Sequence, residues 1–95
     1  MQLGLGTGFE FDDGEQLLVS VQKPIGMVLE EAEPAGCVVA DVLDGSAAGR
    51  AGIEAGYRLL AVNNMDVRAT GLDEVMALLL QSPRVVNLRF ARAAE

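Results

Sequence analysis

Histidine and tryptophan are absent from the 95-residue sequence, and cysteine occurs once. Without histidine the chain cannot form a Ser-His-Asp or Cys-His catalytic site or an imidazole metal ligand. One cysteine excludes an internal disulfide, and Cys37 opens an apolar run that is typical of a buried strand rather than of a nucleophile. A Ser-Lys pair could use only Lys23, the sole lysine, and Ser20 on the preceding strand faces away from it. We therefore expect no enzyme activity and no cofactor.

Basic charge is also scarce. Seven Lys and Arg residues stand against fourteen Asp and Glu residues, which gives a formal net charge of −7. Nucleic acids and anionic membrane surfaces both require clustered basic residues, so neither is an expected partner. A basic partner is the natural complement of an acidic domain. The alternative is that the acidity only keeps the domain soluble.

Long apolar runs are missing as well. None approaches the ~20 residues that span a membrane, and no basic leader precedes an apolar block at the N-terminus. We expect no direct membrane insertion and an intracellular location rather than secretion, since a single cysteine is compatible with a reducing compartment. The length predicts one domain with one compact core, and we expect a monomer.

Residues 1–14 are rich in glycine and weakly patterned, so we expect a flexible N-terminal extension before a folded domain over residues 15–92 and a short tail over 93–95. The glycines resemble a phosphate-binding loop, but their spacing is not G-x-G-x-x-G and no strand precedes them. Residues 12–15 lack the alternating ligands of a calcium loop, so we expect no metal.

Alternating apolar residues predict strands, as in Gln16–Gln22, and a helical period predicts one long helix that Thr70 or Gly71 caps. The expected strands cover residues 16–22, 27–30, 37–43, 58–62, 65–67 and 85–90, with a short helix over 47–51 and the long helix over 71–81. Short strands with two helices are typical of a small, partly open β-barrel or sandwich with helical caps.

The long helix is apolar on two stripes, one formed by Leu72, Met76 and Leu79 and the other by Val75 and Leu78. Both stripes could pack into the core. The alternative is that one stripe lines a groove that is open to a ligand.

The segment 23–27, Lys-Pro-Ile-Gly-Met, joins the first two strands. Pro24 lacks an N–H and Gly26 permits a positive φ, so successive N–H groups of the loop could point to solvent. Such a nest favours an anion, including the C-terminal carboxylate of a peptide. An ordinary β-turn with Pro and Gly in turn positions is the alternative.

Four segments in order resemble a PDZ domain, over roughly residues 16–92. They are similar to the family's Gly-Leu-Gly-Phe loop, its Gly-Ser-x-Ala and Ala-Gly-Leu segment, its x-Ile-Leu-x-Val-Asn-Gly strand and turn, and its second helix. In this sequence they are Pro24-Ile25-Gly26-Met27, residues 44–48 with 51–53, residues 58–64, and residues 72–80. The resemblance implies a mainly β fold, a six-stranded antiparallel β-sandwich or partial barrel capped by one short and one long helix.

The resemblance also implies a function, namely binding the C-terminal tail of another protein as a strand beside residues 27–31. The tail's carboxylate would accept hydrogen bonds from the N–H groups of Ile25, Gly26 and Met27, with Lys23 assisting. Its last side chain would enter a pocket of Ile25, Met27, Leu29, Met76 and Leu79. The expected groove comprises Val28, Leu29, Glu30, Leu72, Met76 and Leu79, with Leu72, Val28 and Met76 near the third-from-last ligand residue.

Three residues depart from the family pattern. Pro24 replaces the first glycine of the loop, and Tyr57 stands where Asp is usual after Gly56. Leu72 stands where many members carry His, so a hydrophobic-x-hydrophobic tail (class II-like) is expected rather than Ser or Thr. Residues 23–31 also look like PDZ-like proteins of algae and plants, which adds a plastid to the cytoplasm as an expected location.

Two other functions stay open. The domain could recognise substrates within a larger serine protease, or it could be a structural domain whose groove its own tail or a neighbour fills. The acidic residues Glu30, Glu31 and Glu33 at the far end of the predicted groove favour basic ligand residues upstream of the last three.

Overall fold

The computed structural model describes residues 16–92, so the expectations for residues 1–14 and 93–95 lie outside it. The strands are β2 (Gln16–Gln22), β3 (Met27–Glu31), β4 (Cys37–Val42), β5 (Arg58–Val62), β6 (Met65–Asp66) and β7 (Val85–Ala91), and the helices are α1 (Ala47–Arg50) and α2 (Leu72–Gln81). None of the helices in this range is long and apolar enough to cross a membrane.

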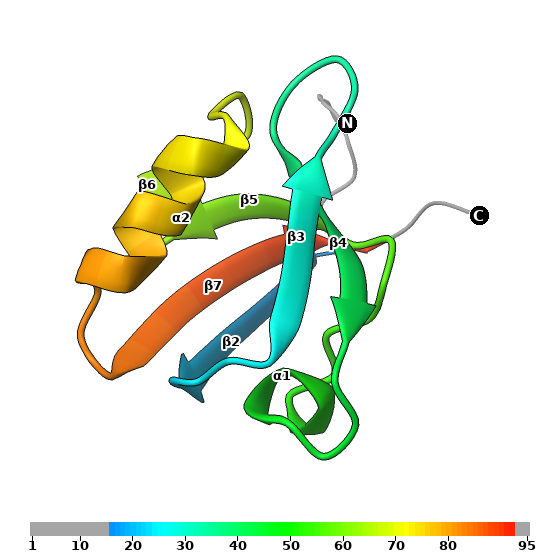
Figure 1. Ribbon diagram of the computed structural model, residues 1–95, viewed down its shortest axis with the longest axis vertical. Helices are drawn as coiled ribbons and strands as arrows, with labels where there is room; N and C mark the ends of the chain where they lie inside the picture. The colour runs from blue at the N-terminus through cyan, green and yellow to red at the C-terminus, as the bar shows by residue number, and fades with distance from the viewer. Residues whose placement is uncertain (1–15, 93–95) are drawn as a thin grey trace, which may run out of the picture.

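The strands form one antiparallel sheet in the order β2-β7-β5-β4-β3, with β6 paired to β5. The sheet curls without closing into a barrel, so β2 and β3 remain its two end strands. Figure 1 shows α2 beside β3 and over β7, whereas α1 lies near the end at which β3 begins. The prediction of six antiparallel strands with two helices is confirmed, and a closed barrel is excluded.

One core holds the sheet and the helices together. Its buried side chains are Val21, Cys37, Val39, Ala48, Ile53, Tyr57, Leu59, Val62, Val67, Val75, Leu79, Val86, Leu88 and Phe90. In β2 the alternation is as expected, since Val21 is buried whereas Leu18 is 61% exposed. Cys37 is fully buried, as its apolar surroundings in the sequence predicted.

Tyr57, one of the departures from the family pattern, belongs to this core. Its ring packs against Phe90 with the centroids 6.4 Å apart. The turn before it is held by backbone hydrogen bonds, because Gly56 donates to the carbonyl of Val39 and Val39 donates to the carbonyl of Tyr57. The replacement of Asp by Tyr therefore leaves the turn intact and adds apolar area to the core.

The element boundaries differ from the expected ones by at most one residue. β3 runs one residue further, to Glu31, while β4 ends at Val42 because the next residue, Leu43, turns toward the loop before α1 and exposes its side chain. Ser46 begins α1 as predicted, since its side-chain oxygen accepts a hydrogen bond of 3.1 Å from the N–H of Gly49.

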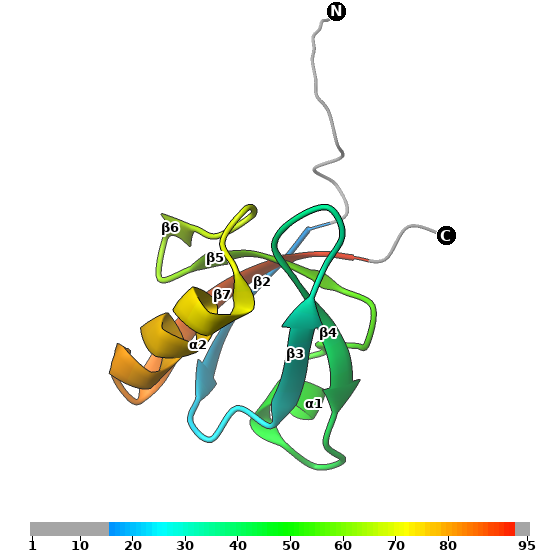
Figure 2. The same ribbon diagram turned by 45° about the horizontal axis from the view of Figure 1, so that its top comes forward.

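Both expected stripes of α2 contribute to the core, because the buried residues Val75 and Leu79 come from different stripes. Met76 is 44% exposed and Leu80 is 79% exposed. The division between a core face and an open face therefore does not follow the two stripes, and Figure 2 shows the helix alongside β3. Gly71 is the N-cap residue and offers no side chain to the free N–H groups of the first turn.

Candidate functional site

In the loop between β2 and β3, the carbonyl groups of Ile25 and Gly26 accept hydrogen bonds from α1 and from the residue after β4. The N–H of Ala48 donates to the carbonyl of Ile25 at 2.8 Å, and the N–H of Leu43 donates to the carbonyl of Gly26 at 2.9 Å. Within residues 16–92, no acceptor takes a hydrogen bond from the N–H of Ile25 or of Gly26. The loop therefore presents two successive free backbone donors, as the nest hypothesis requires.

Gly26 is required where the loop passes α1. Its φ is +86°, and a Cβ atom at this position would lie 2.3 Å from the Cβ of Ser46. Only a residue without a side chain fits both the backbone conformation and the space. The peptide bond between Lys23 and Pro24, on the other side of the loop, is cis.

β3 continues the row of free donors as an open strand edge. β3 pairs only with β4, and because the carbonyl of Gly26 points to β4, the N–H and C=O of Met27 point to the opposite edge. The same alternation turns the backbone groups of Leu29 and Glu31 outward. The edge of β3 that faces α2 can therefore pair with an added strand.

A hollow of about 220 Å³ lies between the loop, β3 and α2. Its lining consists of Lys23, Pro24, Ile25, Gly26, Met27, Leu29, Met76, Leu79 and Leu80. The structure thus brings together eight residues that the sequence placed in the carboxylate loop or the pocket. Leu80 was missed, although it follows Met76 by four residues and so lies on the same side of the helix.

Three residues of the expected groove lie outside this hollow. Val28 and Glu30 are exposed, and by the alternation of a strand they face away from the row of Met27 and Leu29. Val28 and Leu72 therefore do not line this hollow, and a contact of both with one ligand side chain stays a prediction. Leu72 lies at the other end of α2, where its side chain is partly buried against the core.

The C-terminal end of α2 is bound by Lys23. Its Nζ donates to the carbonyl oxygens of Ser82 at 2.7 Å and Leu80 at 3.3 Å. An ammonium group is favourable there because the carbonyl end of a helix carries partial negative charge. Lys23 was expected to serve the carboxylate loop; the structure shows that it borders the hollow and also joins the loop to the helix.

The N-terminal end of α2 is bound by Glu31. Its Oε2 accepts a hydrogen bond of 2.9 Å from the backbone N–H of Leu72. The strand expected from the sequence ended at residue 30, and Glu31 was expected to favour basic ligand residues, so this contact was not foreseen. Glu31 also pairs with Cys37 across β3 and β4. The pKa of the Cys37 thiol is raised chiefly by burial and further by the negative charge of Glu31, whereas the positive charge of Arg58 lowers it.

Comparison with known proteins identifies the family. A family model described as PDZ domain matches residues 16–90. The chain belongs to the PDZ domain family.

Two solved structures of PDZ domains are similar to it. One is the PDZ domain from choanoflagellate SHANK1 bound to a GIRK3 peptide, which is 29% identical, with a TM-score of 0.75 over 83% of this chain and 93% of that one. The other is the third PDZ domain of INAD in complex with a TRP channel tail, which is 27% identical, with a TM-score of 0.76 over 83% of this chain and 88% of that one. A search of curated proteins found no match.

PDZ domains are protein-interaction modules, which agrees with the absence of a catalytic set from this sequence. Among residues 16–92, no group of three or more Cys, Asp or Glu side chains could hold a metal ion. The resemblance found in the sequence is therefore confirmed at the level of family and fold.

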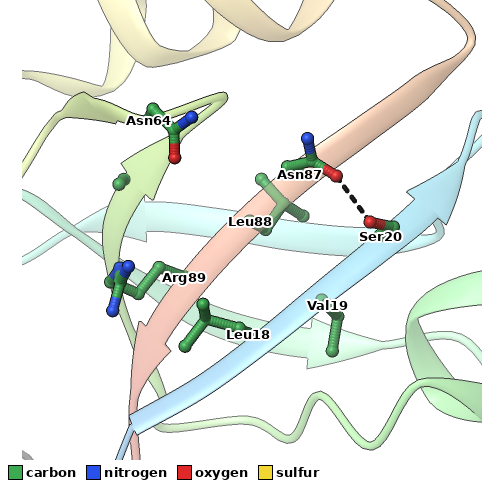
Figure 3. Close-up of a pocket in the computed structure, with 8 residues that line it drawn as sticks. Leu18, Val19, Ser20, Asn64, Asn87, Leu88 and Arg89 are labelled. Carbon is green, nitrogen blue, oxygen red and sulfur yellow. Dashed lines mark hydrogen bonds between the residues drawn. The ribbon is translucent and has the colours of Figure 1, made fainter.

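The PDZ domain has a second hollow of similar size on the opposite, outward face of β2 and β7 (Figure 3). Its lining consists of Leu18, Val19, Ser20, Ala61, Asn64, Asn87, Leu88 and Arg89. Across its floor the hydroxyl of Ser20 donates to Oδ1 of Asn87. This hollow lies apart from the free edge of β3, so it is not part of the groove.

Proposed function

We propose that this PDZ domain binds the C-terminal tail of another protein, which adds as a strand to the free edge of β3. The observation that carries the proposal is the pair of free N–H groups of Ile25 and Gly26 beside an apolar hollow. A carboxylate in this place would accept charge-assisted hydrogen bonds from them and from Met27. Lys23 borders the same space with a positive charge.

The lining of the groove favours a hydrophobic-x-hydrophobic tail. Side chains of an added strand alternate, so the last and the third-from-last residues face the same way. The last would enter the hollow between Met27, Leu29 and Leu79. The third-from-last would lie nearer Leu72 and Met76, whose side chains offer it no hydrogen bond.

The complexes of the two similar PDZ domains support a peptide ligand. One was solved with a GIRK3 peptide and the other with a TRP channel tail. Both share the fold of this chain over more than four-fifths of its length, and the groove of this chain offers a free edge of its own.

The test compares one peptide ending in Val, Leu or Ile as a free acid and as its C-terminal amide. A hydrogen bond to a charged group contributes roughly 1.5–3 kcal/mol, so the acid should bind at least tenfold more tightly. Equal affinities would exclude the proposed role of the loop. A failure to bind any free-acid peptide would favour a structural domain.

A pair of variants tests the location. Leu80→Glu places a charge at the mouth of the hollow, whereas Leu18→Glu places the same charge on the far face of the sheet, and both positions are exposed. We expect Leu80→Glu to weaken binding and Leu18→Glu to leave it unchanged. The opposite pattern would move the site to the hollow of Figure 3.

A further inference from the structure

The two ends of α2 differ in their local caps. Gly71 provides no side-chain hydrogen bond at the N-terminal end. At the C-terminal end the last turn contains no basic residue, but the hydroxyl of the C-cap residue Ser82 donates to the carbonyl of Leu78 at 2.7 Å. A helix leaves several backbone N–H groups free at its start and several carbonyl groups free at its end, and these require partners from elsewhere.

Both ends obtain partners from the opposite wall of the groove. Lys23, which follows β2, donates to carbonyl groups at the C-terminal end, and Glu31, the last residue of β3, accepts from Leu72 at the N-terminal end. The charges match the helix dipole, negative at the start and positive at the end. The two side chains therefore span the groove at its two ends.

The two attachments differ in strength. The C-terminal end is held several times over, since Asn63 donates to the hydroxyl of Ser82 at 3.0 Å and the N–H of Lys23 donates to the carbonyl of Arg84 at 2.9 Å. At the N-terminal end, the N–H of Leu72 donates to Glu31, and this is the only hydrogen bond between β3 and α2 in the described part of the chain. The C-terminal end of the helix thus has several hydrogen-bond partners outside the helix, whereas the first turn has one across the groove, besides the packing of Leu72 and Val75 on the core.

The position of Glu31 in β3 explains how it reaches the helix. Met27, Leu29 and Glu31 alternate along one face of the strand, the face toward α2 and the core. Glu31 stands third in this row, so its carboxylate lies beside Leu72, where the third-from-last ligand side chain is proposed to sit. An added strand that runs along β3 must pass this contact.

We propose that Glu31 is a positioning residue, which holds the N-terminal end of α2 against β3 and thereby sets the width of the groove at the third-from-last ligand position. The proposal rests on the proposed function. Removing the contact should let the start of α2 move away from β3, while the end near Lys23 stays in place. Selection at the third-from-last residue should then relax, and selection for a free carboxylate should remain.

The experiment measures the affinities of four proteins for a series of peptides that differ only in the third-from-last residue, which is Ala, Val, Leu or Phe. These are the wild type, Glu31→Ala, Glu31→Gln and Glu74→Gln. The amide oxygen of Gln can still accept from Leu72, so Glu31→Gln should keep most of the selectivity. Glu74→Gln removes the same charge from an exposed site in the first turn of α2 and is the matched control.

We expect the ratio between the best and the worst peptide to fall at least about threefold in Glu31→Ala and to stay near the wild-type value in both Gln variants. Hydrogen exchange at the Leu72 N–H should accelerate in Glu31→Ala alone. The acid-to-amide affinity ratio should be the same in all four proteins.

Two results would overturn the proposal. One is a best-to-worst affinity ratio in Glu31→Ala that equals the ratio in Glu74→Gln. The other is a rate of hydrogen exchange at the Leu72 N–H that is unchanged in Glu31→Ala. Equal binding of acid and amide by the wild type would overturn the proposed function instead, and the exchange at Leu72 would then decide alone whether Glu31 holds the helix.

Discussion

Gly26 lies so close to Ser46 that it could not carry a side chain unless one of the two residues shifted. A Cβ atom on Gly26 would come within 2.3 Å of the Cβ of Ser46 and 2.8 Å of its hydroxyl oxygen. Ser46 in turn is the N-cap of α1. The start of the short helix therefore fixes the position of the loop that offers its N–H groups to a ligand.

The first prediction follows from this contact. Gly26→Ala should destabilise the domain by more than Gly45→Ala, although both glycines have a positive φ. Gly45 has no atom within 4 Å of an added Cβ, so its variant bears only the backbone cost of about 1–2 kcal/mol. Gly26→Ala bears the clash with Ser46 in addition. Urea unfolding of both variants measures the difference.

A double variant, Gly26→Ala with Ser46→Gly, tests whether the clash with Ser46 causes the extra loss of stability. Glycine at an N-cap costs only a few tenths of a kcal/mol, so removing the Cβ of Ser46 should recover part of the loss. Equal losses in Gly26→Ala and Gly45→Ala would show that the loop can move away from α1.

Leu72 gives the second prediction. Leu72→His would add a hydrogen-bond donor at the start of α2, and selection at the third-from-last ligand residue should shift from apolar residues toward Ser or Thr. In the wild type, a buried hydroxyl without a partner there costs about 1–3 kcal/mol. A peptide array that compares the two proteins is the measurement. If the wild type already selects Ser or Thr, Leu72 does not face the ligand.

Much of the fold could be predicted from local patterns. The alternation in Gln16–Gln22 and the turn residues Asn63 and Asn64, which both have a positive φ, appear in the structure as expected. The order of strands in the sheet could not be predicted from periodicity, because the pairing of β2 with β7 joins segments at the two ends of the domain. The family resemblance supplied six antiparallel strands and two helices, and the structure supplies the order of the strands.

The residues around the hollow could be placed by motif, but the contacts of the charged residues could not. Glu31 and Leu72 are 41 positions apart, and nothing in either segment signals a hydrogen bond between them. Lys23 was interpreted as a partner for a carboxylate because its place before the loop is known in the family, whereas its bonds to the end of α2 depend on the tertiary structure.

Charge gives the third prediction. Glu30 and Glu33 are exposed at the end of the groove remote from the loop, and Glu31 is engaged with Leu72. Tails with Lys or Arg upstream of the last three residues should bind more tightly than tails with Ala there. Exposed ion pairs contribute at most ~1 kcal/mol each and are screened by salt. Titrations at low and at high salt measure the effect, and a preference for acidic upstream residues would contradict it.

Cys37 gives the fourth prediction. Because burial raises the pKa of its thiol above the ordinary value of 9.0, the native protein holds this proton more tightly than the unfolded chain does. The associated stability is complete below the ordinary pKa and is lost as the pH rises through the raised value. The free energy of unfolding should therefore fall above about pH 9 more steeply in the wild type than in Cys37→Ala.

Urea unfolding between pH 7 and pH 10.5 measures how steeply the free energy of unfolding falls with pH in the wild type and in Cys37→Ala. A parallel check uses a thiol reagent, which should label Cys37 slowly in the native protein and rapidly in urea, since the side chain is fully buried. Fast labelling of the native protein would show that the strands around Cys37 open readily.

The open edge of β3 has a consequence for how copies of this domain meet one another. A row of unpaired N–H and C=O groups is a template for any extended chain, including the same edge of a second molecule. Glu30, Glu31 and Glu33 at the end of that row, in a molecule with a net charge of −7, would face like charges in such a dimer. The acidity that is predicted to favour a basic tail would thus also repel an identical neighbour, and concentrated salt should weaken this protection against aggregation.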